Sequence, residues 1–198
     1  MSIAITILVT FVVGTAYASI FEWVLHKYVM HRPIWKFRYP FETHALTHHR
    51  LFRADHSYHL QTWAGREKIG MAWWNGPTLI ALATTPFILV AMCLRNFIDP
   101  HEVGAILVAS FCVIAGYYAA YEYLHWCMHL PRSRWVERLH IFRRLNGHHI
   151  LHHRYIGTNF NVVLPFADFL FGTLLLRARA SFPQVHGPSV PDIQPSSM

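Results

Sequence analysis

The stretch Val103-Gly-Ala-Ile-Leu-Val-Ala-Ser-Phe-Cys-Val-Ile-Ala-Gly-Tyr-Tyr-Ala-Ala-Tyr121, continuing through His125 to His129, decides the fold of this 198-residue chain. It carries no charge up to Tyr121, and as a helix it is long enough to cross a bilayer. Its end carries two histidines four residues apart, which share one helix face. The stretch therefore predicts a membrane-spanning helix whose end can bind a metal ion.

Two further apolar runs predict two further spanning helices. The run Ile3 to Leu25 contains one charged residue, Glu22, and would be about 35 Å long as a helix. The run Met71 to Leu94 is uncharged but contains Pro77 and Pro86, so we expect a kinked or broken helix there.

A fourth apolar run, Val162 to Leu176, is short and contains a proline and Asp168, which favours an interfacial or core element over a span. Four prolines after Ser181 predict an extended tail. We therefore expect an all-α integral membrane protein with one membrane-embedded domain, residues 1–180, and a proline-rich tail, residues 181–198.

The composition favours the same class of protein. Hydrophobic residues make up 54% of the chain and charged residues only 14%, whereas soluble domains carry about 25% charged residues. This argues against a disordered chain, a coiled coil and an ordinary soluble enzyme. The basic residues behind the formal net charge of +7 flank the apolar runs, which fits an anionic membrane leaflet better than nucleic acid.

The basic residues also predict the orientation. Sixteen of the seventeen Lys and Arg residues lie in Lys27–Lys68 or Arg132–Arg179, and only Arg95 lies in the connection Arg95–Glu102. Because cytoplasmic loops carry the excess of basic residues, we expect both large polar segments in the cytoplasm and the N-terminus outside, in the cytoplasmic (inner) membrane. Fifteen of the sixteen histidines, all but His101, fall on that predicted cytoplasmic side.

Ten of these histidines form four boxes, each beside the predicted cytoplasmic end of an apolar run or in the adjoining polar segment. The patterns are HX4H, HX3HH, HX3H and HX2HH. In chain order, the candidate metal ligands are His26 and His31; His44, His48 and His49; His125 and His129; and His149, His152 and His153.

Helical spacing predicts how the boxes pair, because residues three or four apart share a helix face. The expected pairs are His44 with His48, His125 with His129, and His149 with His152 or His153. His26 and His31 are five apart, about 140° around an ideal helix, so they need the helix end or kink that Arg32-Pro33 can supply.

The number of boxes predicts a polynuclear metal site. Neutral imidazole suits Fe, Zn, Cu and Ni, and ten ligands are too many for one ion and about right for two. Burying ten imidazoles without metal would leave many donors and acceptors unpaired.

The sequence leaves the roles of several other polar residues unassigned. His148 can replace His149 by a shift of one residue. His56 and His59 form a further HX2H that either supports the site or lies on the surface. Glu122, one turn before the third box, is a candidate ligand, a residue supporting the ligands, or a buried acid paired with arginine. The expected non-ligands are His101, His140 and His186.

The order of the boxes resembles the fatty acid hydroxylase/sterol desaturase superfamily of integral-membrane di-iron oxygenases. The stretch Asn159-Phe-Asn-Val-Val-Leu-Pro-Phe-Ala-Asp-Phe-Leu-Phe-Gly-Thr173 is similar to the closing segment of that family. The opening segment Glu22 to His31 also resembles carotenoid hydroxylases, but the thirteen positions from His31 to His44 favour the fatty acid/sterol type. In this resemblance Asp168 occupies an acidic position; it either orients a ligand imidazole or pairs with an arginine.

The resemblance implies O2-dependent oxidation, hydroxylation above all, of a lipid-like substrate by two iron ions, with zinc possible in the isolated protein. Desaturation is the alternative within the same chemistry. The chain has no GxGxxG, CxxC cluster or haem-binding domain, so an external electron donor of the ferredoxin, rubredoxin or cytochrome b5 type is implied. The arginines between Arg132 and Arg144 could dock an acidic donor or bind lipid headgroups.

Two other classes of function compete with this interpretation. A non-enzymatic metal-binding or metal-transport protein would need polar ligands near the middle of its spans, and Ile3–Ala18 and Val103–Ala115 contain no charged residue or histidine. A b-type haem protein would pair histidines on separate spans, whereas these boxes are dense and one-sided.

Overall fold

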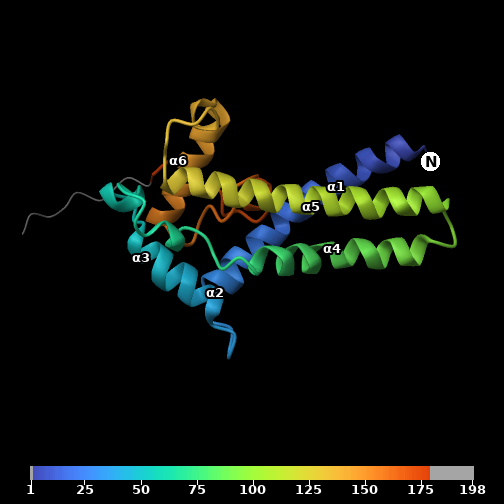
Figure 1. Ribbon diagram of the computed structural model, residues 1–198, viewed down its shortest axis with the longest axis horizontal. Coiled ribbons are helices and arrows are strands. Elements are labelled where there is room, and N and C mark those ends of the chain that lie inside the picture. Colours follow the sequence, from blue (N-terminus) through green and yellow to red (C-terminus); the bar gives the residue numbers. More distant parts are fainter. Residues whose placement is uncertain (1, 179–198) are drawn as a thin grey trace, which may run out of the picture.

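The computed structural model describes residues 2–178, and no β-strand occurs among them. Helices α1 (Ile3–Val24), α4 (Asn75–Leu94) and α5 (Pro100–His129) form a bundle in which α5 packs along both of the others. At one end of this bundle the remaining helices form a polar cap (Figure 1). The all-α prediction is confirmed, and the predicted tail lies outside the described residues.

Three helices are long and apolar enough to cross a membrane, as the three apolar runs predict. They cover Ile3–Met30, Asn75–Leu94 and Pro100–His129. Side chains on the outward faces are large and apolar, for example Leu8 and Val108, which are 62% and 66% exposed. Such faces suit lipid rather than water, so this is a membrane protein.

Helix α4 is unbroken, so of the kinked or broken helix expected there, the broken form is wrong. The helix begins at Asn75 rather than at Met71. Pro77 therefore lies in the first turn, where its missing N–H has no intrahelical partner to lose. Pro86 lies inside the helix, which spanning helices tolerate because neighbouring groups can satisfy the freed carbonyl.

Small residues let α1 approach α5 closely. Thr10, Gly14 and Ala18 recur every four residues and are buried. A Cβ on Gly14 would lie only 3.1 Å from Val113 Cγ1. In lipid, helices associate through such close packing rather than through the hydrophobic effect.

Short helices and turns build the cap. Their bounds are η1 (Leu25–Met30), α2 (Tyr39–Phe41), η2 (Glu42–His48), α3 (His49–Leu51), η3 (His56–Tyr58), η4 (Arg66–Lys68), η5 (Val136–Arg138), α6 (His140–Arg154) and α7 (Phe166–Leu170). Helix α7 is all that forms from the fourth apolar run, and its Ala167 and Asp168 are fully buried. That run is therefore not a span, as expected.

Candidate metal centre

The ten histidines of the four boxes gather in the cap as two groups of five. The first group is His26, His31, His44, His49 and His152, and the second is His48, His125, His129, His149 and His153. Within each group the candidate ligand nitrogens all lie within 4.8 Å of one another. The groups adjoin, because the rings of His49 and His153 lie 4.3 Å apart between centroids.

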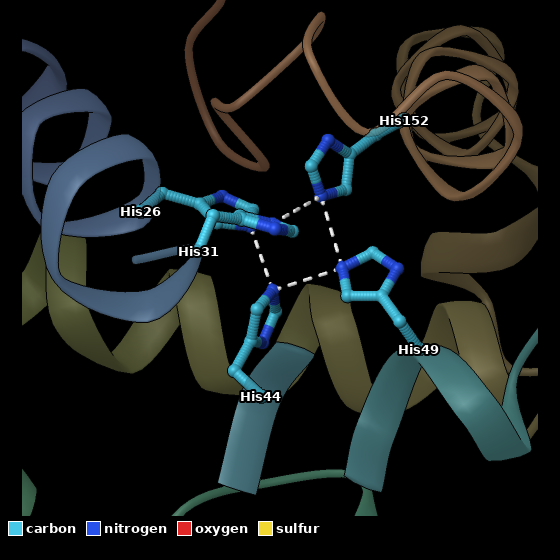
Figure 2. Close-up of side chains that lie close together, drawn as sticks. All are labelled: His26, His31, His44, His49 and His152. Carbon is cyan, nitrogen blue, oxygen red and sulfur yellow. Dashed lines mark hydrogen bonds between the residues drawn. The ribbon is translucent and has the colours of Figure 1, made fainter. Parts of the chain in front are cut away.

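Direct contacts between Nε2 atoms connect the first group (Figure 2). The contacts are His26–His44 at 2.8 Å, His44–His49 at 3.1 Å, His49–His152 at 3.2 Å and His31–His152 at 3.2 Å. In the second group, His149 Nε2 lies 3.1 Å from the Nε2 atoms of both His129 and His153. The Nε2 atoms thus point toward a common centre in each group.

Two π-helical turns place histidines five residues apart on one face. The first is η1, where the His31 N–H donates to the His26 carbonyl at 3.1 Å. The second is η2, where the His49 N–H donates to the His44 carbonyl. An i→i+5 hydrogen bond brings residues five apart onto the same side, and π turns are frequent at functional sites. The π turn therefore joins the first box, and the helix ends at Met30, just before Arg32-Pro33, as expected.

The same geometry corrects one predicted pair. His44 belongs with His49, and His48 turns to the second group, so the pairing of His44 with His48 is wrong. The α-helical spacing does hold for His125 with His129 in α5.

In α6, His149 joins His153 four residues later, while His152 faces the first group. Helix α6 and the π turn η2 thus each supply histidines to both groups.

Backbone carbonyls fix the ring orientation of five of the ten histidines. Their Nδ1 atoms contact the carbonyls as follows: His26 that of Phe160, His152 that of Thr158 at 2.8 Å, His48 that of Lys68 at 3.3 Å, His129 that of Tyr58 at 2.9 Å and His153 that of Phe52 at 2.5 Å. A carbonyl oxygen only accepts, so each Nδ1 carries the proton. Each Nε2 then presents a lone pair to its group, which is how metal-ligating histidines are usually held.

The second group tests whether a cation fits. The Nε2 atoms of His48 and His125 are buried and have no hydrogen-bond partner among the described residues. The lone pairs of His129 and His153 both face His149, whose Nε2 can donate at most one proton. A metal ion would satisfy these atoms together, and a set of imidazoles suits a first-row transition metal.

Burial keeps the ligands neutral, as metal binding requires. Desolvation, with the charges of neighbouring histidines, lowers the pKa of His31 to about 3. Burial lowers the pKa of His48 to about 4 and places that of His152 well below its usual range. A protonated ring in either group would carry its charge into the interior, so at neutral pH the lone pairs are available.

Asp168 supports the first group through the backbone. Its carboxylate accepts hydrogen bonds from the N–H groups of Phe160 and Asn161 at 2.9 and 2.8 Å, and from the Thr173 hydroxyl at 2.6 Å. Burial opposes its ionisation, but these bonds and one from His148 hold the pKa of Asp168 below its usual value. Because the Phe160 carbonyl holds His26, the carboxylate acts on a candidate ligand through the backbone.

That arrangement differs from both predicted roles of Asp168. Its imidazole partner is His148, at 3.2 Å, which belongs to neither group. No ion pair with an arginine is found for Asp168 within residues 2–178. His148 accordingly does not replace His149.

Glu22 is a supporting residue that spacing alone does not reveal. It accepts the Val162 N–H at 2.6 Å, the Asn161 amide at 3.0 Å and the Tyr117 hydroxyl at 2.7 Å. Glu22 and Asp168 therefore clamp the segment after the last box from two sides. The available signal is that Glu22 is the only charged residue in the first apolar run, one turn before His26.

The remaining candidates lie outside both groups. His56 is exposed, and His59 Nδ1 donates to the Met128 carbonyl at 2.9 Å. His101 and His140 are exposed, and His186 lies outside the described residues.

Glu122 is also separate from the two groups. Its carboxylate accepts a hydrogen bond from the Tyr118 hydroxyl at 2.8 Å, and no arginine pairs with it among the described residues. It is therefore not placed as a ligand.

An apolar cavity of about 680 Å³, including its opening, lies between α1, α4 and α5. Its walls include Phe21, Ile80 and Ile114, and His26 is the one member of the two groups among the residues that line it. A hydrocarbon chain in this cavity would lie beside the first group.

Comparison with family models, with curated proteins and with solved structures gives no match for this chain. What the centre can do chemically is therefore inferred from its own residues.

Loss of a single ligand should reduce metal content. We expect about two ions per folded wild-type chain, and fewer after His129→Ala or His152→Ala, because each change removes one nitrogen from a different group. His140→Ala is the matched control, since that side chain is exposed at the start of α6. Elemental analysis of monodisperse protein checks this, and metal loss in His140→Ala would contradict the two groups.

Asp168→Asn should weaken the support of His26. The amide offers one acceptor oxygen where the carboxylate serves four donors, so we expect a loss of about 1–3 kcal/mol in stability and about 10–100-fold in metal affinity. Asp55→Asn is the control, because Asp55 caps η3 at the surface and asparagine caps helices equally well. Thermal unfolding measures the stability and competition with a chelator measures the metal affinity. Equal values for Asp168→Asn and Asp55→Asn would refute the support of His26 by Asp168.

Proposed function

We propose that this chain is a membrane-bound non-haem di-iron oxidoreductase that uses O2 to hydroxylate a lipid-like substrate. The observation that carries the proposal is the convergence of two groups of five imidazoles beside an apolar cavity between spanning helices. A metal pair alone fits many functions, but a metal pair next to space for a hydrocarbon chain favours chemistry on that chain.

The chain's own residues bind and orient. The ten imidazoles would hold two ions, while Asp168 and Glu22 keep the segment that carries the Phe160 carbonyl in place. Bound iron supplies the redox chemistry that activates O2, which no side chain can provide. The walls of the cavity position the substrate and exclude water from it.

The stoichiometry of the proposed reaction shows that the chain needs electrons from an external donor. Hydroxylation converts a C–H bond and O2 into a C–OH group and water, and it consumes two electrons and two protons. An electron donor of the ferredoxin, rubredoxin or cytochrome b5 type would supply the electrons. The segment from Arg132 to Arg144 offers a basic surface for such an acidic partner, with Trp135 70% exposed.

The order of the boxes supports membership of the fatty acid hydroxylase/sterol desaturase superfamily as part of this proposal. Desaturation of a lipid or sterol, and carotenoid hydroxylation, use the same metal chemistry and differ in the fate of the substrate. These outcomes differ in product mass: oxygen insertion adds one oxygen atom, and desaturation removes two hydrogen atoms.

A non-enzymatic metal-binding or metal-transport protein is the competing class. The ligands of both groups come from the cap and from the cap ends of α1 and α5. A transport path would need polar ligands deeper in the spans. The positions favour a catalytic centre at one membrane face over a path across it.

Lipid analysis tests the enzymatic proposal. Cells expressing the gene with a suitable electron donor should contain a lipid that has gained one oxygen atom, and His129→Ala or His152→Ala should abolish it. His140→Ala should keep more than about a tenth of the activity, which corresponds to an activation barrier raised by less than about 1.4 kcal/mol. Mass spectrometry makes the comparison. An unchanged lipid profile, together with metal uptake into proteoliposomes, would favour transport instead.

The orientation proposed with this function places the cap in the cytoplasm and the N-terminus outside, in the cytoplasmic membrane. In a chain whose exposed Cys93 and Cys112 are replaced by serine, Ser133→Cys should be protected from a membrane-impermeant thiol reagent in intact cells. Asn96→Cys, in the α4–α5 connection, should be labelled. Labelling with the opposite pattern would reverse the orientation.

A further inference from the structure

A second hollow, on the cap side, adjoins the apolar cavity. This cleft is lined by residues of η2, η4, α5 and the segment that precedes α4, and its polar side chains include Thr43, Thr47 and Lys68. Met71 and Glu122 line both the cavity and the cleft. The two hollows therefore meet at these residues, which we call the junction.

Glu122 has one oxygen engaged and one open at the junction. Oε1 accepts from the Tyr118 hydroxyl at 2.8 Å, and Oε2 makes no hydrogen bond within residues 2–178. A Cβ on Gly70 would lie 3.2 Å from Oε2, so the missing side chain of Gly70 leaves this oxygen uncovered. The other carboxylate that lines the cavity, Glu22, already accepts three hydrogen bonds.

The charges around the junction decide which polar group can lie there. A carboxylate or phosphate would face the Glu122 oxygen at close range. No Lys or Arg forms an ion pair with Glu122 among the described residues, and Glu67 adds a second carboxylate to the cleft beside Arg66 and Lys68. A group that donates a hydrogen bond, by contrast, finds an acceptor whose bond to a charged partner is among the stronger kinds.

We propose that the cavity and the cleft form one site for a single-chain amphiphile whose head, a hydroxyl or an amine, donates a hydrogen bond to Glu122 at the junction. This rests on the proposed function, since it names the class of substrate. The chain fills the apolar cavity, whose wall along α4 from Asn75 to Ala83 is about 12 Å long. The head lies in the cleft, and the portion of the chain nearest the cap passes His26.

Binding of simple probes tests this without turnover. Protein in nanodiscs, with its metal content measured, is equilibrated with radiolabelled dodecanol, dodecylamine or dodecanoate, and empty nanodiscs are subtracted. Dodecanol or dodecylamine should bind at least about tenfold more tightly than dodecanoate, the scale expected for a hydrogen bond to a charged group. If only dodecylamine binds more tightly than dodecanoate, the preferred head group is an ammonium group. Equal or tighter binding of dodecanoate would overturn the proposal.

Variants locate the effect at the junction. Glu122→Gln should abolish the preference for probes whose heads donate a hydrogen bond. Gly70→Ala should weaken the binding of dodecanol and dodecylamine, because the added methyl group covers Oε2 and leaves the apolar cavity intact. Ile80→Trp should weaken all three probes by filling the cavity. Glu42→Gln, on an exposed carboxylate paired with Arg38, should change nothing. An unchanged preference in both Glu122→Gln and Gly70→Ala would overturn the proposal.

The proposed binding site and the proposed enzymatic activity can be refuted independently. Donor-head binding that depends on Glu122 in a chain whose lipid profile shows no oxidation would support the site and refute the oxygenase. Oxidation of a lipid whose head is anionic would support the oxygenase and refute the assignment of the head.

Discussion

Hydrogen bonds from imidazole Nδ1 atoms to backbone carbonyls are the interaction on which the cap depends. Burying ten polar rings costs free energy unless each nitrogen finds a partner. For five of the ten rings, the carbonyls of cap residues from Phe52 to Phe160 meet that need at Nδ1, on the outer side of the ring. The inner side is left to Nε2 lone pairs, which only a shared cation can satisfy together.

This constraint extends into the membrane. Two of the three spans end in the centre, α1 through its π turn and α5 through His125 and His129. Binding of the ions would join these helix ends to α6 and η2, and would thereby couple metal binding to folding. The short polar segments of the cap, irregular as they are, have a common purpose: they present carbonyls and carboxylates at fixed positions behind the rings.

The spans and the identity of the clustered histidines could be predicted because they depend on strong local patterns. Apolar length indicates the helices, and repeated histidines beside them indicate a cluster. The division into two groups could not be predicted, because α-helical spacing assigns His44 to His48 whereas a π turn assigns it to His49. The roles of Glu22 and His148 depend on contacts with residues more than a hundred and about twenty positions away, respectively, which no periodicity encodes.

Helix α5 has thirty residues, and at about 1.5 Å per residue it is roughly 45 Å long. The hydrocarbon layer of a bilayer is only about 30 Å thick. An upright α5 would therefore carry its last turns, with His125 and His129, well beyond the hydrocarbon on one side. If the proposed lipid oxidation is correct, an acyl chain held in the surrounding lipid could not reach that height unaided, and the apolar walls of the protein would have to guide it partly out of the bilayer.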